Sequence, residues 1–336
     1  MNNPIGLLLD LDTPTGAQVA QTLGATYFRP VDAIVLEGWN GECREADIAK
    51  QLGFQLLLSV RNNGGGMSAP TTPPTDLAAY KTALAAVLDK YPPMVLAVEN
   101  EENSSIFYTG TPEEYGVELR AAIEVAHAKG IKVSNGGTVS ALVALLTWDN
   151  YLTQGNVGAA SSYCARAFDP SQKKSLEKIT APRQYDARTK EQIQKGKGLL
   201  EQYKTSGMDY MNFHWYINDA AALGESAAFL SQAVGKPLVV NEMGQQNDDP
   251  AVVRPLLQKA VDLGFGYAVW FSVDAPQAKS LYDSTTGALR SNGQEFKNFM
   301  TELFYIVHTL HHLFFLLGHA LGLLRENIIR TPRDAG

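Results

Sequence analysis

Residues 111–134 read TPEEYGVELRAAIEVAHAKGIKVS, and this stretch contains the unit from which the fold is built. A threonine followed by Pro112, with a glutamate three residues after the threonine, is typical of the start of a helix. Tyr115 and Leu119 begin an apolar series at helical spacing. Gly130 suits the left-handed residue that closes a helix, and an apolar run begins directly after it. The stretch therefore predicts a helix that leads at once into a strand.

The same joint between a helix and a strand recurs along the chain, at Gly24, Gly53, Gly130, Gly207, Gly235 and Gly264. Each glycine precedes a short apolar run, as expected of strands in a parallel sheet that is buried on both faces. These joints predict eight strands, over residues 5–9, 26–29, 55–60, 94–98, 131–134, 209–214, 238–241 and 267–271. Eight units of strand and helix in roughly 250 residues favour an α/β fold of the (β/α)8 TIM-barrel type. No Gly-x-Gly-x-x-Gly follows the first strand, which argues against a doubly wound dinucleotide-binding sheet.

The connection after the fifth predicted strand is much longer than the others. It contains two helical patterns, of which only the second, over 189–206, is needed for the barrel. We therefore assign residues 1–304 to the barrel and treat about 140–185 as an insertion after strand five. Connections that follow strands emerge at the catalytic mouth of such a barrel. The insertion is expected to form a lid or a groove wall there, or to be an excursion without a role.

The C-terminal tail, 305–336, is surplus to the predicted fold. Residues 303–324 contain no charged side chain and hold four of the six histidines. Packing on the barrel, a cloning or frame artefact, and an interaction or membrane helix all remain open. His308 and His312 have the spacing of a metal site on a helix, which is a further alternative.

The overall composition excludes several classes of function. The net charge is −7, so we expect no nucleic-acid partner. Cys43 and Cys164 are too few for a disulfide framework or a zinc cluster. Residues 1–4 lack the basic start of a signal peptide, so the protein is expected to be secreted or periplasmic if a leader has been removed, and cytoplasmic otherwise. We expect a monomer that makes no membrane contact outside the tail.

Polar side chains follow the predicted strands where each one ends. Two of them, Glu101 and Glu242, are carboxylates that follow strongly apolar runs, where a buried charge is costly unless it is used or paired. Two carboxylates that face each other across a barrel mouth are what glycoside hydrolysis requires, one as an acid and one as a nucleophile or base. The alternative is that each glutamate only pairs with Arg29 or Arg61 as scaffolding.

Several of these strand ends together resemble a known clan. The resemblance lies in Asn100-Glu101 after strand four, His214-Trp215-Tyr216 after strand six, Asn241-Glu242-Met243-Gly244 after strand seven and Trp270 in strand eight. The set is similar to the clan A type of retaining glycoside hydrolases, which carry an Asn-Glu pair on strand four and a lone glutamate on strand seven of a (β/α)8 barrel. It covers about residues 5–304.

The resemblance implies a role for each matching residue. Glu101 would be the general acid/base and Glu242 the nucleophile, and Asn100 would bind the sugar 2-hydroxyl. Arg29 and Tyr216 would keep Glu242 ionised and hold its orientation. His214 would line the subsite of the reacting sugar, and Trp270 would form the floor under that sugar. The clan often has proline after the acid/base glutamate, whereas Glu102 stands here. Strand alternation alone does not choose between Glu99 and Glu101, which share parity.

Aromatic side chains at the mouth suit a carbohydrate ligand, because sugar rings stack on them. Trp39, in a loop after the second strand, is the best candidate away from the strand ends. We therefore expect a retaining glycoside hydrolase that cleaves β-linked oligo- or polysaccharides without a cofactor. The alternatives are a transglycosidase and an inactive carbohydrate-binding barrel. A metal-dependent or Schiff-base barrel lacks its signature, since Asp10-Leu11-Asp12 replaces a His-x-His and the one strand lysine, Lys132, begins its strand.

Overall fold

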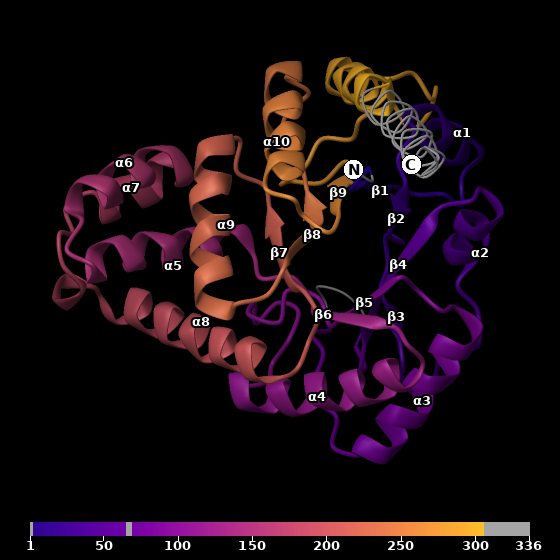
Figure 1. The fold of residues 1–336 in the computed structure, drawn as a ribbon, viewed down its shortest axis with the longest axis horizontal. Coiled ribbons are helices and arrows are strands. Elements are labelled where there is room, and N and C mark those ends of the chain that lie inside the picture. Colours follow the sequence, from indigo (N-terminus) through magenta and orange to yellow (C-terminus); the bar gives the residue numbers. More distant parts are fainter. Residues whose placement is uncertain (1–2, 65–68, 306–336) are drawn as a thin grey trace, which may run out of the picture.

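The strands form a ring of parallel neighbours enclosed by helices (Figure 1). This computed structural model describes residues 3–64 and 69–305. The order around the sheet is β6-β5-β4-β2-β1-β9-β8-β7. Its members are β1 (Ile5–Leu8), β2 (Tyr27–Phe28), β4 (Gln55–Arg61), β5 (Val95–Val98), β6 (Lys132–Asn135), β7 (Met211–Trp215), β8 (Leu238–Met243) and β9 (Ala268–Phe271). All eight predicted strands are present.

The ring closes between β6 and β7 through isolated bridges and a ladder of asparagines. Ser134 pairs with Tyr210 in a parallel bridge. The backbone N–H of Asn212 donates to Oδ1 of Asn135 at 2.7 Å, and Nδ2 of Asn212 donates to the Asn135 carbonyl at 3.1 Å. Side-chain amides thus replace part of the missing backbone ladder, and the prediction of a (β/α)8 barrel is confirmed.

The helices that follow the strands form the outer layer. They are α1 (Pro14–Leu23), α2 (Arg44–Gln51), α3 (Leu77–Lys90), α4 (Pro112–Ala128), α8 (Ala187–Thr205), α9 (Ala220–Val234), α10 (Pro250–Asp262) and a last helical stretch over 291–305. Thr111 and Glu114 form the capping box expected at the start of α4. The six joint glycines have φ between 65° and 90°, the left-handed conformation that the sequence predicts for them.

A short strand, β3 (Ile34–Val35), was not predicted. It pairs in parallel with the end of β4, through Val60 and Arg61. Two residues carry no periodicity, so the sequence pattern has no signal for such a strand. Its effect is to extend the mouth side of the sheet next to β4.

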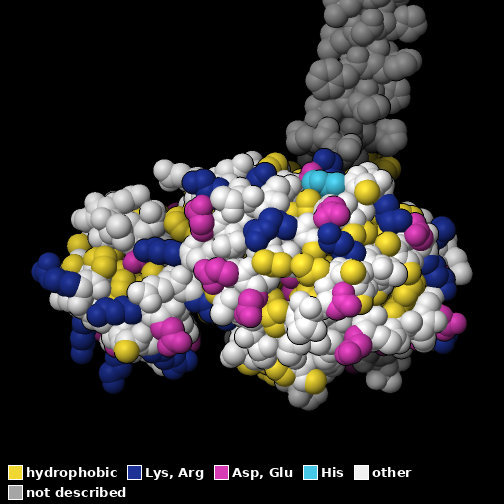
Figure 2. Space-filling view, turned by 90° about the horizontal axis from the view of Figure 1, so that it is seen from below, with side chains coloured by type: hydrophobic (Ala, Val, Ile, Leu, Met, Phe, Trp, Pro, Cys, Tyr) yellow, Lys and Arg dark blue, Asp and Glu magenta, His cyan; other side chains and the backbone are white. Residues whose placement is uncertain are grey.

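Three additional helices and a 3₁₀ turn lie between β6 and α8: α5 (Ser140–Thr153), α6 (Val157–Ala167), α7 (Pro170–Leu176) and η2 (Pro182–Gln184). Because α8 packs against both α4 and α9, it occupies the ring position that follows β6. The additional helices form a lobe beside α8 and α9 (Figure 1). Figure 2 shows this lobe at the left, set off from the barrel by a hollow.

Two apolar layers separate the inside of the barrel from the helices outside. The inner cluster contains Leu8, Leu57, Val95, Val239 and Val269, and the outer cluster joins the other strand faces to the helices. Successive residues of a strand point to opposite faces, so each strand contributes to both layers. No helix of the described part of the chain is long and apolar enough to cross a membrane. The expectations for the tail concern residues 306–336, which lie outside the described residues.

Candidate active site

The two predicted carboxylates meet at the mouth of the barrel. Glu101 follows β5 and Glu242 lies within β8, at the ends of strands on opposite sides of the ring. One oxygen of each carboxylate and one nitrogen of His214, on β7, lie within 4.8 Å of one another. His214 Nδ1 is 2.9 Å from Oε1 of Glu101 and 3.4 Å from Oε2 of Glu242. The imidazole therefore stands between the two acids.

Glu242 is held by two donors and is almost buried, with 7% of its surface exposed. Arg29 Nη1 donates to Oε1 at 2.8 Å, and the Tyr216 hydroxyl donates to Oε2 at 2.8 Å. Burial alone would raise the pKa of Glu242, but the charges of His214 and Arg29 and the Tyr216 hydrogen bond lower it. The carboxylate is thus kept ionised and fixed in orientation.

Arg29 also positions Asn100. Its Nε donates to Ser59 Oγ at 3.0 Å, and its Nη2 donates to Asn100 Oδ1 at 3.1 Å. Because Arg29 occupies the amide oxygen of Asn100, the amide NH₂ is the group that this residue can offer to a ligand. Ser59, in the middle of β4, was not among the predicted site residues. Its only signal in the sequence was a serine within an otherwise apolar run.

The His214 ring is fully buried and is packed against a glycine. Burial disfavours the imidazolium, but the carboxylates of Glu242 and Glu101 outweigh this and raise the pKa of His214. Gly137, with φ of 108°, lies beside the ring, and a Cβ at this position would be 2.2 Å from His214 Nε2. Only glycine therefore leaves room for the imidazole in this orientation.

The chain turns sharply where β5 ends. Glu99 and Glu101 have φ of 69° and 48°, in the left-handed region that residues other than glycine rarely adopt. Such a conformation costs about 1–3 kcal/mol and persists only where the surroundings enforce it. The turn breaks the strand alternation, so the two glutamates no longer share a face.

Glu99 points away from the carboxylate pair and is fully buried. Its Oε1 accepts the Asn62 N–H at 2.8 Å, and its Oε2 lies 3.8 Å from Arg61 Nε. Burial is the main cause that raises the pKa of Glu99 to about 7. The structure thus brings Glu101, not Glu99, to Glu242.

Two more buried carboxylates lie behind the mouth. Glu102 Oε1 accepts hydrogen bonds from the Tyr203 hydroxyl and, at 2.8 Å, from Asn135 Nδ2. Glu118 Oε2 accepts from the Tyr108 hydroxyl at 2.9 Å. Burial raises the pKa of Glu102 and that of Glu118. The glutamate at position 102 therefore anchors the turn after β5 to the helix layer and does not reach the mouth.

The prediction that Trp270 forms the floor under the sugar is wrong, because its side chain points outward to the helix layer. Trp270 is fully buried and packs edge-on against Phe296 of the last helix, with ring centroids 6.1 Å apart. The next residue, Phe271, faces the mouth instead and packs edge-on against Tyr216 at 5.9 Å. Both faces of this strand are apolar, so the sequence did not reveal which parity points inward. Phe271 is a partly exposed aromatic residue beside Tyr216, which binds Glu242, and the prediction missed it.

Trp39 does not reach the mouth either. Its ring packs edge-on against Tyr91, just after α3, at 6.4 Å, and its Nε1 donates to the Glu42 carbonyl at 3.2 Å. Tyr91 leads toward the start of β5, at the opposite end of the strands from the carboxylates. The expectation that Trp39 contacts the ligand is therefore not supported.

Among the described residues, one group of side chains is close enough to hold a metal ion. It consists of Glu101, His214 and Glu242. Both oxygens of Glu242 already accept hydrogen bonds from Arg29 and Tyr216. A guanidinium at 2.8 Å opposes a second cation at the same carboxylate. The arrangement suits acid–base and nucleophilic chemistry better than metal binding.

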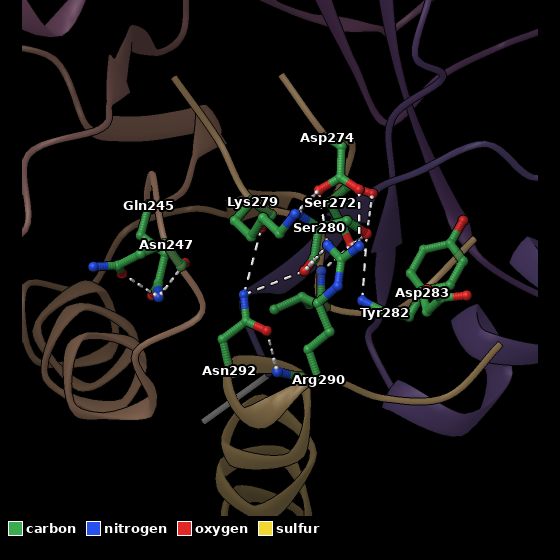
Figure 3. A network of polar contacts seen from close by, with 12 residues as sticks. Gln245, Asn247, Ser272, Asp274, Lys279, Ser280, Tyr282, Asp283, Arg290 and Asn292 are labelled. Carbon is green, nitrogen blue, oxygen red and sulfur yellow. Dashed lines mark hydrogen bonds and ion pairs between the residues drawn. The ribbon is translucent and has the colours of Figure 1, made fainter. Parts of the chain in front are cut away.

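One rim of the mouth is built by the connection after β9. Asp274 accepts hydrogen bonds from Arg290 Nη1 at 2.7 Å and from the Ser280 N–H at 3.0 Å (Figure 3). The Arg290 hydrogen bond is the main reason why the pKa of Asp274 is lowered. A cavity of about 210 Å³ lies between this network and the end of β1, where Asp10 and Tyr282 line it. The network fixes a polar edge of the mouth between the ends of β9 and β1.

Comparisons with known proteins identify the architecture. No family model matches the chain, and no curated protein matches it. Among solved structures, a GH128 subgroup VI exo-β-1,3-glucanase from Aureobasidium namibiae aligns with a TM-score of 0.51 and 11% identity, over 88% of this chain and 96% of that one. A GH128 subgroup II endo-β-1,3-glucanase from Pseudomonas viridiflava aligns with a TM-score of 0.50 and 16% identity, over 88% and 96%. A glycoside hydrolase family 30 subfamily 8 xylanase from Clostridium acetobutylicum gives 0.50 and 15%, over 89% and 71%. The chain therefore shares the (β/α)8 fold of these glycoside hydrolases.

Proposed function

We propose that the protein is a retaining glycoside hydrolase that acts on β-linked oligo- or polysaccharides. The observation that carries the proposal is the placement of Glu101 and Glu242 around one histidine, with an oxygen of each within 4.8 Å. Retaining enzymes hold their two carboxyl groups about 5–5.5 Å apart, and inverting enzymes about 6.5–9.5 Å apart to admit a water. The short separation favours retention.

Glu242 is the proposed nucleophile. Its lowered pKa keeps it ionised, and Arg29 and Tyr216 fix both oxygens. In the first step an oxygen of Glu242 bonds to the anomeric carbon as the bond from that carbon to the leaving oxygen breaks. The leaving oxygen takes the proton of Glu101, and a glycosyl ester of Glu242 results.

Glu101 is the proposed acid and then the base. In the second step it accepts a proton from water as the water oxygen attacks the anomeric carbon and the ester bond breaks. His214 Nδ1, 2.9 Å from Oε1, orients this carboxyl, and the same imidazole lies 3.4 Å from Oε2 of Glu242. The NH₂ of Asn100 is free to donate to a sugar hydroxyl at the same edge.

The substrate class follows from the mouth and from the architecture. Phe271 offers an apolar face beside Tyr216, and the rim that contains Asp274 offers polar groups for hydroxyls. The two glucanases that share the fold act on β-1,3-glucans and the third protein on xylan, as their names state. We therefore take β-1,3-glucan as the first substrate to test and xylan as the second.

Glu242→Gln tests the proposal. The variant should lose essentially all hydrolysis of β-1,3-glucan oligosaccharides, while Glu113→Gln, an exposed change on α4, keeps wild-type rates. A 2-fluoro glycoside should label the wild-type chain on the peptide that contains Glu242, as seen by mass spectrometry. An active Glu242→Gln variant, or a product of inverted anomeric configuration, would overturn the mechanism. Glucan binding without turnover in the wild type would instead identify an inactive barrel.

A further inference from the structure

A second cavity lies next to the loop that follows Glu101 and plays no part in the chemistry described so far. It has a volume of about 520 Å³ and lies between the loop after β5, the start of α5, α7 and the first half of α8. We call it the α7–α8 pocket. Its polar lining includes Ser171, Ser175 and Gln192, and its apolar lining includes Leu142 and Phe168. A mixed surface of this kind and size suits one or two sugar rings.

The pocket adjoins the acid end of the site. Asn103, two residues after Glu101, lines it, and Asn103 Oδ1 accepts the Val139 N–H at 3.0 Å. The next residue, Ser140, accepts the Tyr216 N–H at 2.9 Å and donates to the His214 carbonyl at 3.1 Å. If Glu101 is the general acid, as the proposed function states, the leaving sugar lies on its side of the mouth. The α7–α8 pocket therefore lies on the leaving-group side.

The charged side chains that line the pocket are all positive. Lys195 and Arg188 line it, whereas no Asp or Glu does. Within the described residues, neither cation has a carboxylate within 4.0 Å, although Lys195 is half-buried. Burial lowers the pKa of Lys195, and the more distant Glu102 and Glu191 offset this in part. A partly desolvated ammonium without an ion pair is costly unless a ligand supplies the counter-charge.

The chain around the pocket, from the end of α6 through α7 and η2 to α8, also has a positive net charge. Residues 166–204 carry ten Lys and Arg against five Asp and Glu, a net charge of +5 in a chain whose net charge is −7. Figure 2 shows Lys and Arg side chains gathered over this lobe. Such segregation raises the local concentration of anionic ligands. The basic character therefore belongs to this face and is not a property of the whole surface.

We propose that the α7–α8 pocket binds an anionic group, a carboxylate or a sulfate ester, on the sugar that occupies the leaving-group side. The guanidinium of Arg188 suits bidentate contact with such oxygens, and Lys195 adds a second positive charge deeper in the pocket. The hydroxyl and amide groups of Ser175 and Gln192 are available for the neutral hydroxyls of the same ring. The assignment rests on the proposed function and refines its substrate: the backbone is still a β-linked glucan or xylan, and the sugar on the leaving-group side carries an acidic substituent.

Binding tests this assignment separately from catalysis. The probes are glucuronate, glucose 6-sulfate, glucose and inorganic sulfate, titrated by NMR into the ¹⁵N-labelled full-length Glu242→Gln chain. The two anionic sugars should bind at least tenfold more tightly than glucose and shift resonances of residues in the pocket. The carboxylate and sulfate arms show which of the two groups is preferred. Equal binding of glucose, or equal binding of inorganic sulfate alone, would overturn the assignment.

Variants of α8 provide the matched controls. Lys195→Met keeps most of the aliphatic stem and should weaken the anionic sugars at least tenfold, whereas Lys195→Arg should retain them. Lys204→Met removes one exposed charge from the same helix outside the pocket and should leave the affinity unchanged. An equal loss in Lys195→Met and Lys204→Met would overturn the assignment, because only a diffuse field would then attract the sugar. Failure of the proposed function would appear instead as absent hydrolysis with this binding intact.

Discussion

Nη1 of Arg29 lies 2.8 Å from Oε1 of Glu242, although the two residues are 213 positions apart in the chain. The same guanidinium reaches Asn100 through Nη2 and Ser59 through Nε. One side chain directly after β2 therefore sets the geometry of residues from β4, the turn after β5 and β8. The planar, forked shape of a guanidinium allows this, and a lysine at position 29 lacks the donors for it.

Arg29→Met should raise the pKa of Glu242, because a positive charge that lowers it is removed. Glu242 would then be protonated over more of the acid range. The acid limb of kcat/KM should shift to higher pH, and kcat at neutral pH should fall about 10²-fold. Rate profiles between pH 3 and 8 measure both effects. An acid limb that stays in place would show that Arg29 does not control the ionisation of Glu242.

Glu101→Gln and Glu99→Gln should separate the two glutamates. Loss of the proposed general acid should lower kcat on unactivated glucan about 10²–10⁴-fold and much less on a dinitrophenyl glycoside, whose leaving group needs no proton. Glu99→Gln should stay within a few-fold of the wild type on both substrates, since Glu99 faces Asn62 and Arg61. The opposite pattern would reassign the acid to Glu99.

The stability of the protein should depend on Glu99 in a definite pH window. Its pKa is raised from 4.5 to about 7 in the folded state, so the folded chain holds this proton more tightly than the unfolded chain does. Its contribution to stability is present below about pH 4.5 and declines as the pH rises toward 7. Glu99→Gln should flatten this decline. Urea midpoints of the two chains between pH 4.5 and 8 measure the difference, and parallel curves contradict it.

Phe271→Ala should impair substrate binding, whereas Trp270→Ala should impair stability. The first removes the apolar face at the mouth and should raise KM for oligosaccharides while leaving the melting temperature nearly unchanged. The second opens a cavity beneath the helix layer and should lower the free energy of unfolding by about 3–5 kcal/mol. Steady-state kinetics well below the melting temperature, with calorimetry of both variants, distinguish the effects. If Trp270→Ala changed the kinetics without lowering the stability, Trp270 would have to contact the ligand.

Gly137→Ala tests how tightly His214 is confined. The added methyl group would lie 2.2 Å from Nε2, and alanine is strained at φ of 108°. The imidazole should move away from the two acids, so kcat should fall by at least tenfold. Gly130→Ala is also strained at φ of 72°, but its Cβ meets nothing within 4 Å, so it should lose stability and keep kcat. Equal kcat values in the two variants would contradict the confinement.

The sequence was sufficient for the barrel because its signals are local. A glycine at each joint and an apolar run after it define a strand start, and the left-handed glycines of the structure explain the pattern. The two-residue β3 has no such signal. The closure between β6 and β7 depends on the side chains of Asn135 and Asn212, which pair only once the sheet has curved.

The site was predictable where a residue ends a strand and only in part elsewhere. Arg29, His214 and Glu242 could be placed because strand ends converge at one mouth. The inward parity of β9 could not, because Trp270 and Phe271 are both apolar. The turn at Glu99 and Glu101 could not be predicted either, because glutamate does not favour positive φ.

The left-handed backbone at Glu101 also has an evolutionary consequence. Position 101 favours glycine or asparagine on conformational grounds alone, so retention of glutamate there requires selection for its carboxyl group. Homologues that lack the proposed activity should therefore carry Gly or Asn at position 101 more often than at position 242, where the strand backbone imposes no comparable bias.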